Sequence, residues 1–153
     1  MKKPTASTPA RIAAAGPARW LVKTEPSTYS FADLVRDGRT TWDGVSNALA
    51  LIHLRAMSKG DPVLVYHSGA EKSVVGLARV AVGPRPDPKL SDPKLVVVDL
   101  EAVAPVRTQV PLAVVKAEPV CRELGLVRMS RLSVMPVDER AWAFLIKAAG
   151  ISG

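Results

Sequence analysis

Residues 95–103 read LVVVDLEAV, and this stretch most directly predicts the fold. Apolar residues at 98, 100 and 102 alternate with Asp99 and Glu101, a period of two that is typical of an antiparallel strand with one buried and one wet face. Residues 62–66 and 73–82 are equally rich in valine and predict two more strands. The sequence therefore indicates a sheet built mainly from antiparallel strands.

Shorter elements are expected on both sides of these strands. Residues 20–23, 40–42 and 132–134 have the composition of brief strands. Ser30, with Asp33 three positions later, resembles a capping box and predicts a helix over 31–36. The prolines of residues 83–88 predict a long surface loop.

Further helical segments are expected in three places. Ser46 or Asn47 can cap a helix that runs to Met57. Residues 112–116 predict a helical turn, and Asp138 caps a last helix whose apolar residues fall at helical spacing until Gly150. Five or six short strands with small helices at their edges predict an α+β protein, a compact and mostly antiparallel β-barrel.

The sequence gives no reason to expect a cofactor. Its glycines do not spell a phosphate-binding loop. One cysteine, Cys121, and two histidines, His53 and His67, are too few soft ligands for a structural zinc site. We expect no cofactor and no metal.

The formal charge of the 153-residue chain is +7, and its distribution is uneven. Lys2, Lys3, Arg11 and Arg19 precede Trp20, with no acidic residue among them. We interpret residues 1–18 as a flexible basic arm, which either contacts phosphates without sequence preference or serves only as a solubilising leader. Residues 19–150 then form one globular domain.

The hydropathy pattern predicts an intracellular, cytoplasmic protein. No apolar run approaches the roughly 18 residues that cross a bilayer, and the first twenty residues lack a secretory signal. No membrane partner is expected, and the oligomeric state is left open.

Aromatic and polar residues gather near the ends of the expected elements. This series consists of Trp20, Lys23, Glu25, Tyr29, Trp42, Asn47, Tyr66 and His67. Aromatic faces sandwich a nucleobase for about 1 to 3 kcal/mol each, while an Asn amide or a backbone group reads its edge. The series favours a pocket for a flat ring; the alternative is that Trp20, Trp42 and Trp142 are all core residues.

Motifs along the chain resemble a known family. They begin with WLVKTEPSTYS at 20–30 and WDGV at 42–45, and continue with YHS at 66–68, VGLA at 75–78, PDP at 86–88 and RLSVMPV at 131–137. In this order and spacing, residues 19–150 resemble the EVE domain family.

The resemblance implies a PUA-like fold, a small β-barrel with flanking helices that is related to the PUA, ASCH and YTH domains. It also implies a pocket for a nucleobase, with modified DNA bases such as methylated or hydroxymethylated cytosine as the suspected ligands. Trp42 would form a wall and Asn47 an edge contact. Further candidates for the rim or floor are Lys23, Ser27, Tyr29, His67, Arg131 and Ser133.

The chain departs from the family pattern at the predicted pocket. Ser46 stands where the family commonly has an arginine, and Ala48 where it has an aromatic residue. Gly69 and Arg85 replace a common asparagine and tyrosine. These changes predict weaker phosphate contacts and altered or lost base binding.

Three functional hypotheses follow. The first is a non-enzymatic reader of a modified base in DNA or RNA, which stacks on Trp42 and contacts Asn47. The second is a nucleotide-processing enzyme with His67 and Glu25 as acid and base. The third is a small-molecule or protein-interaction module that has lost nucleic-acid binding.

Overall fold

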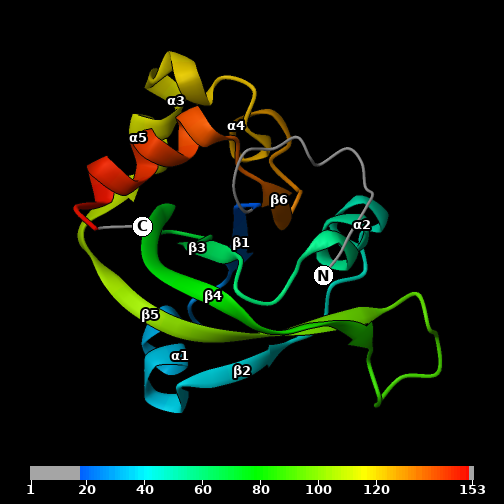
Figure 1. Ribbon diagram of the computed structural model, residues 1–153. Helices are drawn as coiled ribbons and strands as arrows, with labels where there is room; N and C mark the ends of the chain where they lie inside the picture. The colour runs from blue at the N-terminus through cyan, green and yellow to red at the C-terminus, as the bar shows by residue number, and fades with distance from the viewer. Residues whose placement is uncertain (1–17, 152–153) are drawn as a thin grey trace.

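The computed structural model describes residues 18–151, in which six strands form one sheet (Figure 1). The strands are β1 (Trp20–Thr24), β2 (Arg39–Trp42), β3 (Pro62–His67), β4 (Ser73–Pro86), β5 (Val96–Pro111) and β6 (Val134–Pro136). Their order in the sheet is β2-β5-β4-β3-β1-β6. Within the described residues only β1 and β3 pair in parallel. The predicted α+β class with a mostly antiparallel sheet is confirmed.

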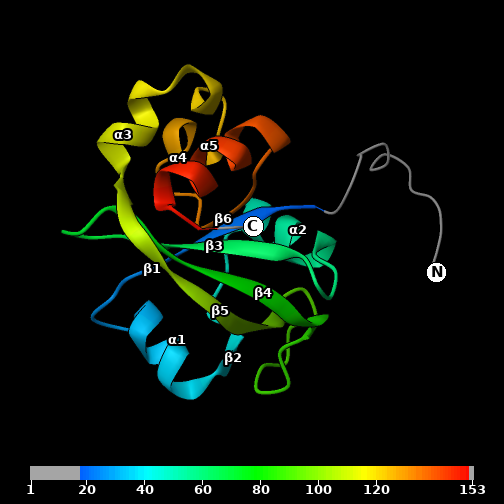
Figure 2. The same ribbon diagram turned by 60° about the vertical axis from the view of Figure 1, so that its left-hand side comes forward.

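The sheet does not close into the predicted barrel. β2 and β6 are its two edges, and no strand pairing joins them within residues 18–151. The long strands β4 and β5 curve strongly (Figures 1 and 2), and their register shifts at four places. Each such bulge bends and twists the pair locally. The barrel is therefore corrected to a strongly curved, open sheet.

The long loop predicted for residues 83–88 is wrong over its first part, because β4 extends to Pro86. β3 accompanies β4 only as far as Arg79, so the end of β4 pairs with β5 alone. A proline is tolerated at such a position because one side of the strand has no ladder partner there.

Within residues 18–151 five α-helices surround the sheet: α1 (Phe31–Asp37), α2 (Ala48–Ala56), α3 (Leu112–Ala117), α4 (Gly125–Arg128) and α5 (Glu139–Ala149), with a 3-10 turn at Pro119–Cys121. α3, α4 and α5 gather on one side of the sheet and α1 lies on the other (Figures 1 and 2). The predicted capping box begins α1, since Ser30 accepts from the Asp33 amide and Asp33 accepts from the Ser30 amide. Asp138 and Gly150 begin and end α5 as predicted.

Because helices cover both faces of the sheet, its central strands are buried. Val22, Val63 and Leu64 have no exposed surface. Trp20 is 4% exposed, and its indole Nε1 donates to Asp61 Oδ2 at 2.9 Å. The Ser58 amide donates to the same oxygen. This carboxylate therefore joins the first strand to the turn that precedes β3.

Two sequence-based predictions concern the chain ends and the membrane. The predicted basic arm, residues 1–18, lies outside the described residues except for Ala18. No helix within residues 18–151 has the length and apolarity needed to span a bilayer.

The buried indoles of Trp20 and Trp142 provide a matched test of the Trp20–Asp61 hydrogen bond. Trp142 is equally buried, but its Nε1 has no hydrogen-bond partner among residues 18–151. We expect Trp20→Phe to cost about 1 to 3 kcal/mol more unfolding free energy than Trp142→Phe, because only Trp20→Phe leaves a buried acceptor short of a donor. Urea denaturation measures both, and equal losses would contradict the role of the bond.

Candidate functional site

A cavity of about 890 Å³ lies where the sheet fails to close. One side is lined by the four consecutive residues of β2, Arg39–Trp42. The opposite side is lined by Lys23 and Thr24 at the end of β1 and by Ser133, directly before β6. Because β2 and β6 are the two edges of the sheet, the cavity occupies the gap between them. The rest of the lining consists of Glu25, Thr28, Tyr29, residues 43–47, Lys89 and Asp99.

Two aromatic side chains form a wall of the cavity. Trp42 is 8% exposed and packs into the core while it lines the cavity. The Tyr29 ring meets it edge to face, with centroids 6.3 Å apart and planes at 84°. The Tyr29 hydroxyl donates to Asp37 Oδ2 at 2.7 Å, and burial raises the pKa of Tyr29. Both rings are therefore held in place by contacts outside the cavity.

Asn47 lines the cavity and is also the N-cap of α2. Its Oδ1 accepts from the Ala50 amide at 3.0 Å, which satisfies one of the unpaired N–H groups of the first helical turn. The side-chain oxygen is thus committed to the helix, and the amide nitrogen remains for an edge contact.

Lys23 connects the cavity to the segment before β6. Its Nζ donates to the Ser130 carbonyl at 2.7 Å and lies 5.9 Å from the centroid of the Tyr66 ring. The Lys23 amide donates to the Ser133 carbonyl. Burial lowers the pKa of Lys23. The two hydrogen bonds of Lys23 therefore tie β1 to Ser130 and Ser133, in the segment that leads to β6 beside the cavity.

Asp99 brings an ionised acceptor to the cavity. Its Oδ1 accepts from Arg85 Nη2 and from the Thr41 hydroxyl, each at 2.8 Å. Burial alone would raise the pKa of Asp99, but these two hydrogen bonds, together with the positive charges of Arg85 and Arg39, hold the pKa below its usual value.

Sequence reasoning missed Arg39, Thr41, Lys89 and Asp99 as lining residues. The available signal was the polar position of Asp99 within the alternating pattern of residues 95–103. Arg39 and Thr41 reach the cavity through the pairing of β2 with β5, and Lys89 reaches it from the loop between β4 and β5; a single sequence shows neither placement.

Three predicted site residues, Ser27, Arg131 and His67, are not among the residues that line the cavity. The amide and hydroxyl of Ser27 both donate to Glu25 Oε1, at 2.8 and 2.5 Å. These bonds lower the pKa of Glu25. Arg131 is exposed on the segment that leads to Ser133.

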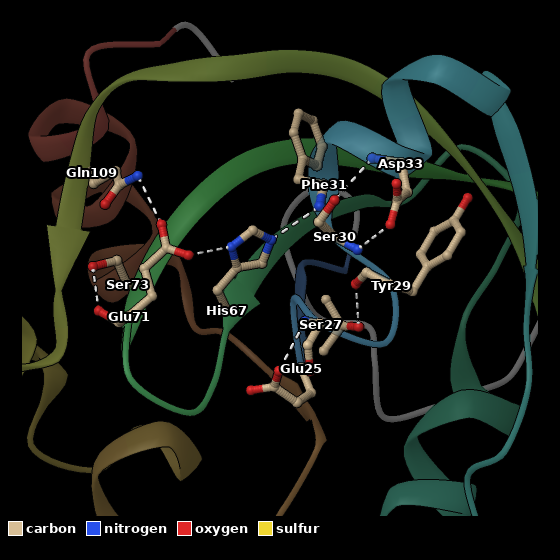
Figure 3. A network of polar contacts seen from close by, with 11 residues as sticks. Glu25, Ser27, Tyr29, Ser30, Phe31, Asp33, His67, Glu71, Ser73 and Gln109 are labelled. Atoms are coloured by element: carbon tan, nitrogen blue, oxygen red, sulfur yellow. Dashed lines mark hydrogen bonds and ion pairs between the residues drawn. The ribbon is translucent and has the colours of Figure 1, made fainter.

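His67 belongs to a separate polar network (Figure 3). It is 7% exposed, and its Nε2 accepts from the Phe31 amide at 2.9 Å. Its Nδ1 lies 2.7 Å from Glu71 Oε1, and Glu71 Oε2 accepts from Gln109. Since Nε2 is an acceptor, the ring proton resides on Nδ1. Nε2 therefore holds the start of α1, while Nδ1 holds Glu71 in the segment between β3 and β4.

Comparison with known proteins identifies relatives over most of the chain. The family model described as EVE domain matches residues 18–148. Rpa0253 from Rhodopseudomonas palustris is 42% identical in sequence, with a TM-score of 0.82 over 87% of this chain and 93% of that one. Human thymocyte nuclear protein 1 is 27% identical over 161 residues, which cover 83% of this chain and 72% of the relative.

Two further solved structures resemble this chain to different degrees. Human THYN1 protein in complex with 5-methylcytosine-containing DNA is 25% identical, with a TM-score of 0.80 over 89% of this chain and 99% of that one. A mutant ASCH protein from Zymomonas mobilis is 12% identical, with a TM-score of 0.55 over 84% and 96% of the two chains. The second likeness is one of fold alone.

The contact between His67 and Phe31 gives a prediction for stability. His67→Ala leaves the buried Phe31 amide without its acceptor, so we expect a loss of about 1 to 3 kcal/mol in unfolding free energy. Ser68→Ala is the control, because this neighbouring residue is half-buried and bonds to Thr24 through its amide, which the substitution keeps. Urea denaturation compares the two; a loss in His67→Ala no larger than in Ser68→Ala would refute the assigned role.

Proposed function

The chain belongs to the EVE domain family, and on this premise we propose that it is a DNA-binding module that captures a modified base in the cavity between the edges of its sheet. The observation that carries the proposal is the aromatic cavity itself, in a fold shared with human THYN1, whose structure contains 5-methylcytosine DNA. Its volume falls within the range of about 300 to 1,000 Å³ that is usual for small-molecule pockets.

The captured base lies against Trp42, with Tyr29 meeting the indole edge to face. Stacking of a base on an aromatic side chain is worth about 1 to 3 kcal/mol. Extrusion from a duplex costs a few kcal/mol and is cheapest for a damaged or already unpaired base. The module therefore binds a modified base in single-stranded DNA more readily than in an intact duplex, and it binds without chemical conversion.

The remaining predicted residues have graded roles in this proposal. Asn47 offers its amide nitrogen at the rim, while Lys23 and Ser133 maintain the β1 side of the cavity. Arg131 contacts the DNA backbone. Ser27 and His67 do not contact the base and only hold the segment before α1 in place. Residues 19–150 form the binding module.

Basic residues hold the phosphates on either side of the base. Lys89 and Arg39 lie in the lining, and Arg39 is also 3.5 Å from Glu101. The basic residues of the arm add contacts without sequence preference.

The stacking role of Trp42 predicts a loss of affinity when the indole is removed. We expect Trp42→Leu, which keeps an apolar core side chain, to weaken binding of a single-stranded oligonucleotide with one 5-methylcytosine by about 5- to 150-fold. Fluorescence anisotropy of the labelled strand measures the affinity.

Trp142→Leu is the matched control, since Trp142 is a buried indole of α5 outside the cavity lining. The Trp142→Leu variant should bind the oligonucleotide with the same affinity as the unaltered chain. If Trp42→Leu binds as tightly as Trp142→Leu, stacking on Trp42 is wrong.

Salt dependence tests the backbone contacts. For single-stranded DNA each phosphate contact adds about 0.7 to the slope of log affinity against log salt. We expect Lys89→Ala to reduce the slope by about that amount, and Lys147→Ala on α5 to leave it unchanged. An affinity that does not respond to salt at all would favour a small-molecule or protein-interaction module.

A further inference from the structure

We infer that the hydrogen-bonding edge of the captured base is read by the main chain of β2 at Thr41, and that this is the main source of edge recognition. The inference rests on the proposed function of the cavity. It assigns the reading of the base to backbone N–H and C=O groups that the open sheet leaves unpaired.

The pairing of β2 with β5 decides which groups are free. In an antiparallel pair, residues that bond across the ladder alternate with residues whose N–H and C=O both point away. The Ala102 amide donates to the Gly38 carbonyl, so this opposed pair is a bonded one. Since bonded pairs recur at steps of two, the opposed pairs Thr40–Leu100 and Trp42–Val98 take the bonded positions that follow. The N–H and C=O of Thr41 therefore point away from β5.

The same groups border the cavity. β2 is the edge strand, so no other strand of the described residues lies on its outer side. Successive side chains of a strand point to opposite faces of the sheet, yet all four residues of β2 line the cavity. A cavity lined by consecutive residues borders the edge of the strand and not one of its faces. Thr41 thus presents its N–H and C=O to the cavity.

These two groups match the edge of an aminopyrimidine. In an extended residue they lie side by side and point in the same direction, a donor next to an acceptor. Cytosine carries a ring nitrogen acceptor, N3, next to an exocyclic amino donor. The Thr41 N–H donates to N3, and the Thr41 carbonyl accepts from the amino group. A methyl group at C5 lies outside this contact, so the arrangement accepts 5-methylcytosine.

Neighbouring side chains are less suited to this task. The Asn47 oxygen is held by the Ala50 amide, and Asp99 Oδ1 is held by Arg85 and by the Thr41 hydroxyl. The hydroxyl bond also fixes the Thr41 side chain across the strand pair. The residue is therefore anchored by its side chain while its main chain faces the cavity.

Thr41→Pro tests whether the Thr41 N–H donates to the base, with Thr41→Val as the matched variant. Both substitutions remove the hydroxyl, but only proline removes the N–H, and proline is tolerated on an edge strand where the N–H faces outward. We expect Thr41→Pro to bind the 5-methylcytosine oligonucleotide about tenfold or more weakly than Thr41→Val. Thermal unfolding verifies that both variants fold. Equal affinities of the two folded variants would overturn the inference.

A ligand-side measurement on the unaltered full chain does not depend on whether a variant folds. Oligonucleotides with 5-methylcytosine or its N4,N4-dimethyl derivative are compared, because dimethylation removes both amino donors and keeps the flat ring. We expect the derivative to bind about tenfold or more weakly, and equal binding would overturn the inference. Failure to bind 5-methylcytosine DNA at all would refute the proposed function and the inference with it. If binding requires Trp42 but is insensitive both to Thr41→Pro and to dimethylation of the base, the inference is refuted while the proposed function stands.

Discussion

The site depends on one constraint, that the two edges of the curved sheet do not meet. β2 has four residues and β6 has three, and the order of the strands places them at opposite ends of the sheet. An exposed strand edge is a template for unwanted pairing, which proteins usually keep short or cover. Here the unpaired main chain of β2 borders a cavity, with the end of β1 on its other side. The polar edge of the sheet thereby becomes part of the candidate site.

Contacts around the cavity hold its walls without entering it. His67 fixes the start of α1 through the Phe31 amide, and the Tyr29 hydroxyl is bonded to Asp37 on the same helix. Asn47 caps α2, and Lys23 reaches across to the Ser130 carbonyl. Several polar residues near the site therefore stabilise local structure first. A precise binding site requires rigid placement of this kind.

Local signals predicted the elements that depend on a few neighbouring residues. The Ser30 and Asp33 capping box and the Asp138 cap were confirmed because a cap is a contact within one helical turn. The motifs from Trp20 to Val137 identified the EVE family, which the family model confirms. The barrel was wrong, and so was the loop over residues 83–86, which belong to β4. Both errors concern which strands lie side by side. The prolines at residues 84 and 86 are tolerated in β4 only because β3 ends its pairing with β4 at Arg79.

The sequence by itself determined most of the elements, the class of fold, the family and a set of eight candidate residues. The tertiary structure alone decided which of them share a cavity. Lys23, Tyr29, Trp42, Asn47 and Ser133 line it, whereas Ser27, His67 and Arg131 do not. It also brought Thr41 and Asp99 there, residues 58 positions apart that meet through the register of β2 with β5. The physical reason is that a one-residue change of register turns every side chain to the other face, and long-range pairing sets that register.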